Sequence, residues 1–182
     1  GVVEHSMTGG SATLPDEMLR RALELVMLRD GEKRWRGAVR GVSRRWRALH
    51  DGACTWLRLR NGVTDEGMHA LCGRLPALKT LILGGVTSLT ADGLRAVGGL
   101  TALTFLHLEY CNVTDVGVRE LRGLTALTTL YLDGCTHVTD AGLQHIKSLT
   151  ALSCLYLYDT STTQAGRNAL KAALPALIIY PR

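Results

Sequence analysis

The chain has 182 residues, of which 46% are hydrophobic, and this is enough for one continuous core. No apolar run approaches the roughly 20 residues that a membrane-spanning helix needs, so a soluble protein that makes no membrane contact is expected. The net charge of +5 is uneven, because residues 14–60 carry 12 Lys or Arg against 6 Asp or Glu, whereas residues 61–182 carry 9 of each.

The first 13 residues are expected to lie outside the fold. Gly1 to Ser6 show no pattern and look like a vector remnant before Met7, and the stretch TGGSAT that follows reads as a flexible lead. The start has no charged, apolar and small-residue sections of a secretory signal, so an intracellular location, in cytoplasm or nucleus, is expected.

Residues 14–55 are predicted to form a small helical module. Pro15, Asp16 and Glu17 resemble the first turn of a helix, with Thr13 as its cap. A second apolar stripe recurs at helical spacing and predicts one or two more helices: Trp35, Val39, Val42, Trp46 and Leu49.

A repeat fills residues 56–182. Leu81, Leu106, Leu130 and Leu155 hold one slot at separations of 25, 24 and 25 residues, with Leu57 placed 24 before and Tyr180 placed 25 after. Each copy has an LxL segment and a turn, and three copies continue with Val-Thr-Asp-x-Gly, which is the leucine-rich pattern of a strand, a turn and a convex helix. The second copy has Thr90-Ala91-Asp92-Gly93 instead, and the last has Thr163-Gln164 in place of Thr-Asp. The pattern predicts an α/β fold, a short right-handed solenoid of about five coils with parallel concave strands. The first two strands are expected at Trp56 to Arg60 and at Lys79 to Leu83.

The residues kept in every copy have structural explanations. Thr64, Thr114 and Thr139 are predicted helix N-caps, and the Asp after each lies in the first turn, where the helix dipole favours it. The five recurrent glycines indicate close packing of each helix against the neighbouring coil: Gly67, Gly93, Gly117, Gly142 and Gly166.

The chemistry-bearing residues do not indicate an enzyme. Nucleophile, phosphate-loop and paired-carboxylate patterns are missing from the sequence, and the histidines are scattered without metal-ligand spacing, so neither a cofactor nor a metal is expected. Cys111 and Cys135 hold the same turn slot of successive copies and are interpreted as buried thiols. A disulfide between them stays open as an alternative, because stacked coils bring such positions within about 4.4 to 6.8 Å.

The residues that the repeat does not dictate predict a binding surface. Outward positions of the strands carry aromatic side chains beside two acids in the third to fifth coils, which suits a protein segment with Lys or Arg beside an apolar anchor. The alternative is that the tyrosines are ordinary cross-strand packers. The candidate partner-binding residues are Phe105, His107, Glu109, Tyr131, Asp133, Tyr156 and Tyr158.

The two parts of the chain together resemble a known family. Leu14-Pro15-Asp16-Glu17-Met18 followed by Val42-Ser43-Arg44-Arg45-Trp46 is similar to an F-box, and the repeats are similar to the cysteine-containing leucine-rich class often joined to F-boxes. Ser43 departs from the usual Cys. The resemblance implies the substrate-recognition subunit of a cullin-RING ubiquitin ligase, in which the F-box binds the ligase adaptor and the concave face binds a protein substrate. The adaptor-binding residues that it implies are Leu14, Pro15, Glu17, Met18, Val42, Arg45 and Trp46.

Two other readings remain open. Similar Val-Thr-Asp-Ala-Gly-Leu repeats occur in bacterial proteins without an F-box role, so the chain could be an interaction scaffold whose helices only cap the solenoid. The arginines between residues 34 and 47 could contact nucleic acid, but they lack interleaved aromatics, and a nucleic-acid partner is not expected. A monomer is expected.

Overall fold

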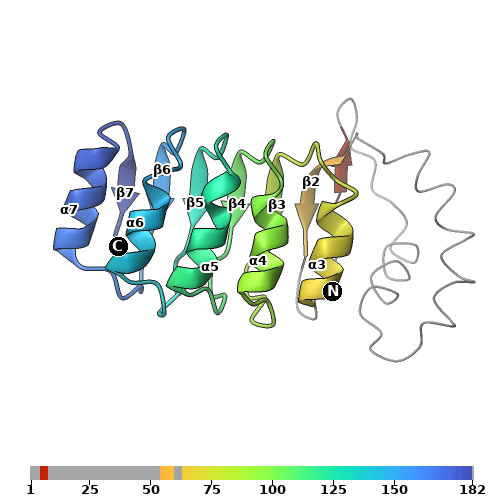
Figure 1. Cartoon of the computed structure of the whole chain (residues 1–182), viewed down its shortest axis with the longest axis horizontal. Helices are drawn as coiled ribbons and strands as arrows, with labels where there is room; N and C mark the ends of the chain where they lie inside the picture. The colour runs from red at the N-terminus through yellow and green to blue at the C-terminus, as the bar shows by residue number, and fades with distance from the viewer. Residues whose placement is uncertain (1–4, 8–53, 60–62, 182) are drawn as a thin grey trace, which may run out of the picture.

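The computed structural model describes residues 5–7, 54–59 and 63–181. These residues form a linear array of coils, each of which runs through a strand, a turn and a helix (Figure 1). The predicted helical module lies outside the described residues, apart from Cys54 and Thr55, which begin a strand. The residues expected to bind an adaptor lie outside the described residues as well, so that expectation stays a prediction: Leu14, Pro15, Glu17, Met18, Val42, Arg45 and Trp46.

One seven-stranded sheet forms the first layer of the array. Strands β2 to β7 lie side by side in chain order and pair in parallel, because each helix returns the chain to the same end of the sheet. The register aligns the leucines of the repeat slot on consecutive strands. The strands are β1 His5–Met7, β2 Cys54–Arg58, β3 Thr80–Ile82, β4 Phe105–His107, β5 Thr129–Tyr131, β6 Cys154–Tyr156 and β7 Ile178–Tyr180.

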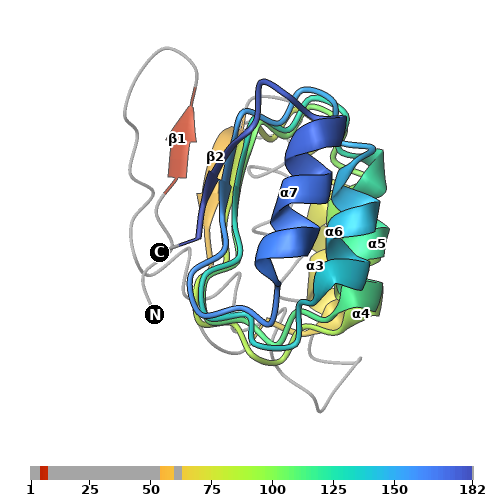
Figure 2. The ribbon, with the colours of Figure 1, turned by 90° about the vertical axis from the view of Figure 1, so that its left-hand side faces the viewer.

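The helices form the second layer and cover one face of the sheet, and within the described residues no helix lies on the other face of β2 to β7 (Figure 2). We call that free face the strand face. The sequence predicts this arrangement, with strands and helices alternating through the repeats. The helices are α3 Asp65–Cys72, α4 Ala91–Gly98, α5 Asp115–Glu120, α6 Asp140–Ile146 and α7 Gln164–Ala173, with a 3-10 turn η1 at Leu121–Gly123.

The core runs without interruption between the two layers. The four slot leucines Leu81, Leu106, Leu130 and Leu155 are completely buried. Full burial of one leucine side chain stabilises a fold by about 1.5–3 kcal/mol, so a leucine repeated in every coil supplies the same contribution at each junction. A single coil could not bury its own apolar face, and stacking therefore holds the array together.

Threonine caps the start of each helix, as the sequence predicts for Thr64, Thr114 and Thr139. The Thr64 hydroxyl accepts a hydrogen bond from the Gly67 N–H at 3.2 Å, and the Thr139 hydroxyl accepts one from the Ala141 N–H at 3.2 Å. These bonds satisfy N–H groups that a helix leaves unpaired in its first turn.

The aspartate after the cap also accepts hydrogen bonds from the next coil, a role that the sequence does not indicate. The Asp115 carboxylate accepts hydrogen bonds from the Thr139 N–H at 2.8 Å and from the Thr139 hydroxyl at 2.7 Å, so it joins two coils. Asp65 and Asp140 form the same pair of bonds with Thr90 and Thr163. Each of these carboxylates therefore fixes the cap residue of the following helix.

The recurrent glycines make room for these carboxylates. A Cβ atom built on Gly142 would lie 2.5 Å from Asp115 Oδ1, and one built on Gly166 would lie 2.1 Å from Asp140 Oδ1. The prediction of close packing against the neighbouring coil is confirmed at these positions. Gly117 differs, because its added Cβ would meet the Leu94 Cδ1 methyl at 2.7 Å instead of a carboxylate.

The cysteines of the turn slot are free thiols, so the predicted thiols are confirmed and the disulfide alternative is wrong. Cys111 and Cys135 are buried, and each S–H donates to a backbone carbonyl of the preceding coil, Leu83 and Leu108 respectively, at 3.1 Å. Burial raises the pKa of Cys111 to about 11 and that of Cys135 to about 12. Both thiols are therefore protonated and unreactive at neutral pH.

The last strand is shifted by one residue from its expected register. The spacing of the repeat puts Tyr180 in the leucine slot and Pro181 on the outward column, whereas Ile179 pairs with Leu155 and Tyr180 pairs with Tyr156. The final copy is one residue shorter than the copy before it. Because a one-residue slip moves each side chain to the opposite face of a strand, Tyr180 joins the strand face.

The first strands also differ from expectation. Residues 5–7 form β1, which pairs antiparallel with β2, although Gly1 to Ser6 were expected to lie outside the fold. Among the described residues no repeat coil lies before β2, and its edge pairs with β1 instead. Strand β2 begins at Cys54, two residues before the expected start, and β3 is shorter than the expected Lys79 to Leu83.

Candidate protein-binding surface

An aromatic column crosses four strands of the strand face. The rings of Tyr131 and Tyr156 stack with centroids 4.0 Å apart and planes 5° apart, and those of Tyr156 and Tyr180 stack at 4.5 Å and 10°. Phe105 extends the column, with its ring 5.5 Å from that of Tyr131 and tilted by 45°. The parallel register of β5 to β7 aligns Tyr131, Tyr156 and Tyr180 in one slot, which His107 holds on β4. Phe105 pairs with Thr129 and therefore lies diagonally from Tyr131. We call Phe105, Tyr131, Tyr156 and Tyr180 the aromatic ridge.

The stacking decides which part of the ridge a partner can reach. Tyr131 and Tyr156 cover each other's faces, so their ring edges and hydroxyl groups point away from the sheet. The neighbouring Tyr131 side chain, through hydrogen bonding, raises the pKa of Tyr156. Ring faces attract cations, whereas ring edges carry partial positive charge. The ridge therefore offers apolar area and hydroxyl groups, while the stacked faces of Tyr131 and Tyr156 are closed to a cation.

His107 and Glu109 lie beside the ridge. The His107 Nε2 atom lies 3.2 Å from Glu109 Oε2, and the imidazole ring packs 5.0 Å from the Tyr131 ring. An added Cβ on Gly84 would meet the His107 ring at 3.0 Å, so the ring lies directly over that backbone. His107 Nδ1 is buried and has no hydrogen-bond partner among the residues that the structure describes. The histidine is thus held in place by packing and orients the Glu109 carboxylate.

Asp133 and Tyr158 lie at the turn that follows β5 and β6. The Tyr158 N–H donates to Asp133 Oδ1 at 2.6 Å. Burial raises the pKa of the Asp133 carboxyl, and the Glu109 carboxylate raises it further, against the opposing effects of the Tyr158 N–H and His107. The acid is therefore partly desolvated beside a second negative charge, a setting that favours a positively charged group from outside.

The structure brings all seven predicted partner-binding residues onto one continuous surface over β4, β5, β6 and the turns after them. Their binding role stays a prediction. The sequence misses two tyrosines of this surface, Tyr180 and Tyr110. A spacing of 24 residues after Leu155 puts Ile179 in the leucine slot and Tyr180 in the outward position beside it. Tyr110 stands out as an aromatic residue in a turn slot that holds Gly85 and Gly134 in the neighbouring copies.

The described part of the chain shows neither a metal-binding cluster nor a membrane-spanning helix. Across residues 5–7, 54–59 and 63–181, no group of three His, Cys, Asp or Glu side chains is arranged to hold a metal ion. Within the same ranges, none of the helices has the length and apolar character needed to span a membrane.

Comparisons with known proteins identify the repeats. A leucine-rich-repeat family model matches residues 99–121. The solved structure of internalin C2 from Listeria monocytogenes is similar over 69% of this chain and 50% of its own, with 23% identity and a TM-score of 0.54. Another internalin of Listeria monocytogenes, inlF, is similar over 65% of this chain and 38% of its own, with 18% identity and a TM-score of 0.41. No curated protein matches the chain.

The family match and the likeness to internalin C2 show a leucine-rich-repeat fold, as the sequence predicts. The chain spans about half the length of internalin C2. The matching family model covers repeat residues alone, so the F-box resemblance receives no support from it and stays a prediction.

Proposed function

We propose that the chain is a non-catalytic interaction scaffold whose strand face binds a segment of another protein. The observation that carries this proposal is the aromatic ridge, a row of four rings on a face that the helices leave uncovered. Aromatic side chains that gather on an accessible surface are typical of protein-binding sites, where they supply a large contact area at a small entropic cost. Leucine-rich-repeat solenoids offer an extended surface suited to that use.

The arrangement of the strands narrows the mode of binding. The backbone groups of β3 to β6 are paired with strands on both sides, so a partner cannot add a strand within this part of the sheet. The partner must therefore contact side chains, with apolar groups on the ridge and positive charge toward Glu109 and Asp133. This supports a protein segment in which a basic residue lies beside an apolar anchor.

An affinity-capture experiment with matched variants tests the proposal. The double variant Tyr131→Ala/Tyr156→Ala should lose partners that the wild type captures from cells. The control Val116→Ala removes an apolar side chain that is 50% exposed on α5, in the helix layer, and should keep them. Equal capture by all three proteins would contradict a strand-face site.

The finer proposal is that the scaffold serves as the substrate-recognition subunit of a ubiquitin ligase. It rests on the F-box resemblance of residues 14–49, and the ridge would then bind the substrate while the helical module binds the adaptor. Binding of the purified adaptor to the full chain, with loss in Leu14→Ala/Pro15→Ala, would support it. An adaptor that does not bind, or that binds both proteins equally, would leave the scaffold without a ligase role.

A further inference from the structure

We infer that Tyr110 and Tyr158 flank Asp133 to form a slot for one arginine side chain of the partner, and that Tyr110 is a specificity-determining residue of the strand-face interaction. The inference rests on the proposed function and names the chemistry of the partner. It also gives the basic contact one position, in the turns that follow β4, β5 and β6.

Backbone hydrogen bonds place the three residues next to one another. The Tyr110 N–H donates to the Asp133 carbonyl at 2.7 Å, and the Tyr158 N–H donates to the Asp133 carboxylate at 2.6 Å. The Gly134 N–H donates to the Tyr158 carbonyl at 2.8 Å. Asp133 is therefore bonded on one side to the coil that carries Tyr110 and on the other side to the coil that carries Tyr158.

Tyr110 and Tyr158 are more exposed than the tyrosines of the ridge. Tyr110 is 57% exposed and Tyr158 is 47% exposed, and both are among the most exposed large apolar residues in the described part of the chain. A Cβ atom on Gly134 would lie 2.2 Å from Tyr110 Cδ1, so the Tyr110 ring rests on the Gly134 backbone. A ring supported from below and open to solvent above can accept a cation on its face.

The charge of the slot is unbalanced. No ion pair involves Asp133 within the part of the chain that the structure describes, and the nearby Glu109 adds negative charge. A cation between the two rings would meet a partly desolvated carboxylate. Arginine fits better than lysine, because its planar guanidinium can stack on a tyrosine ring while its edge donates to Asp133.

The backbone conformation at Tyr110 is one that bulky side chains rarely adopt. Its φ angle is 54°, in the left-handed region that disfavours bulky side chains, and the equivalent slots one coil away on either side hold Gly85 and Gly134. A tyrosine in such a slot gains nothing for the turn itself. The role inferred for its ring gives a reason for a residue that the fold alone would not select.

The slot can be tested without knowing the partner, by titrating the isotope-labelled full chain with N-acetyl-arginine amide and following backbone amide signals by NMR. N-acetyl-citrulline amide, which has the same shape without the charge, is the matched probe. The amides of Tyr110, Gly134 and Tyr158 should shift with the arginine probe alone. Asp133→Asn and Tyr110→Gly should each weaken its binding by about fivefold or more. Glycine fits the φ angle of residue 110, so Tyr110→Gly is expected to fold.

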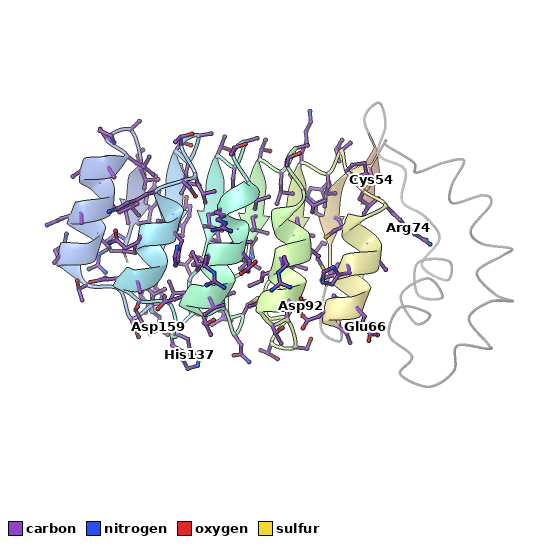
Figure 3. The ribbon with its side chains drawn as sticks, in the orientation of Figure 1. Cys54, Glu66, Arg74, Asp92, His137 and Asp159 are labelled. Carbon is purple, nitrogen blue, oxygen red and sulfur yellow. The ribbon has the colours of Figure 1, made fainter. Side chains whose placement is uncertain are left out.

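Asp159→Gly is the control for general charge attraction, because Asp159 holds the same turn slot one coil beyond Gly134 and has a φ of 53°. Asp159 lies at the edge of the array where the turns lead into the helices (Figure 3). This variant should keep most of the arginine binding. The slot would be overturned if Asp159→Gly lost as much arginine affinity as Asp133→Asn, or if the citrulline probe bound as well as the arginine probe. It would also be overturned if the amides of Tyr110, Gly134 and Tyr158 did not shift.

The outcomes also separate the slot from the proposed function. Tyr131→Ala/Tyr156→Ala should leave the arginine shifts unchanged while it abolishes capture of protein partners. Capture that depends on the ridge, together with a failed arginine titration, would remove the slot and leave the scaffold function. Arginine binding together with capture that ignores the ridge would remove the proposed strand-face function.

Discussion

The Asp140 carboxylate and Thr163 belong to consecutive coils and are joined by two hydrogen bonds, from the Thr163 N–H at 2.8 Å and from its hydroxyl at 2.6 Å. Thr163 also caps helix α7, so the carboxylate of one coil fixes the start of the next helix. Hydrogen bonds to a charged acceptor are stronger than neutral ones. The array is therefore connected along its helix layer by side chains as well as along its sheet by the backbone.

The junction between Asp115 and Gly142 gives the first prediction. Gly142→Ala should destabilise the protein by about 2 kcal/mol, because the new methyl group overlaps the Asp115 carboxylate and forces it away from Thr139. Chemical denaturation followed by circular dichroism measures this cost. Gly117→Ala is the control and should cost less, since its methyl group meets only the movable end of the Leu94 side chain.

A double-mutant cycle tests whether the Asp115 carboxylate causes the destabilisation by Gly142→Ala. In an Asp115→Ala background the methyl group of Gly142→Ala has no carboxylate to displace, and alanine is favoured over glycine inside a helix by about 1 kcal/mol. Gly142→Ala should then become neutral or stabilising. A cost that is the same in both backgrounds would show that the glycine is kept for some reason other than the carboxylate.

The second prediction concerns pH. Hydrogen bonds from the Thr163 hydroxyl and N–H hold the pKa of Asp140 below its usual value of 3.8. A lowered folded-state pKa stabilises the fold above the unfolded-state value, and that stability is lost as the pH falls through the folded-state pKa. The difference in unfolding free energy between wild type and Asp140→Asn should not change with pH near pH 6, and it should shrink as the pH falls below 3.8. A difference that does not change across this range would contradict a stabilising role for the ionised Asp140 carboxylate.

Asp133 should behave in the opposite way, which is the third prediction. Burial raises its pKa above the usual 3.8, so ionisation of this carboxyl costs folded-state stability once the pH exceeds that value. Asp133→Asn keeps an oxygen that can accept the Tyr158 N–H and removes the charge. The variant should have a higher melting temperature than wild type at pH 7, and the gain should vanish as the pH falls below 3.8. A lower melting temperature at pH 7 would mean that the charge itself is needed for folding.

Much of the fold can be predicted from the sequence because the repeat is governed by local rules. The LxL segments, the threonine caps and the glycine slot each have one structural solution, so the order of strands and helices follows from spacing alone. The contact between Asp115 and Thr139 could not be predicted in this way. A carboxylate in the first turn of a helix is already explained by the helix dipole, and only the stacked coils show that it reaches the next cap.

The surface residues were harder to predict than the core. Tyr180 was assigned to the wrong face because the last copy is one residue shorter, and a period-two strand turns that single residue into a change of side. The stacking of Tyr131 on Tyr156 also cannot be predicted from the sequence. The repeat spacing shows that the two tyrosines are neighbours, but it does not show which of their surfaces remain exposed. Tyr110 breaks the pattern of its turn slot, which holds Gly85 and Gly134 in the neighbouring copies, but only the structure shows that its side chain is exposed.

The most direct test of the account is the affinity of a purified protein partner for the ridge variant Tyr156→Ala, measured by titration calorimetry beside its melting temperature. Tyr156 lies between two stacked rings, so its removal should weaken a true partner by about 2 kcal/mol, or roughly thirtyfold. Val116→Ala should bind like the wild type. An affinity that stays at the wild-type value while the melting temperature falls strongly would show that the ridge packs the sheet and is not the binding site.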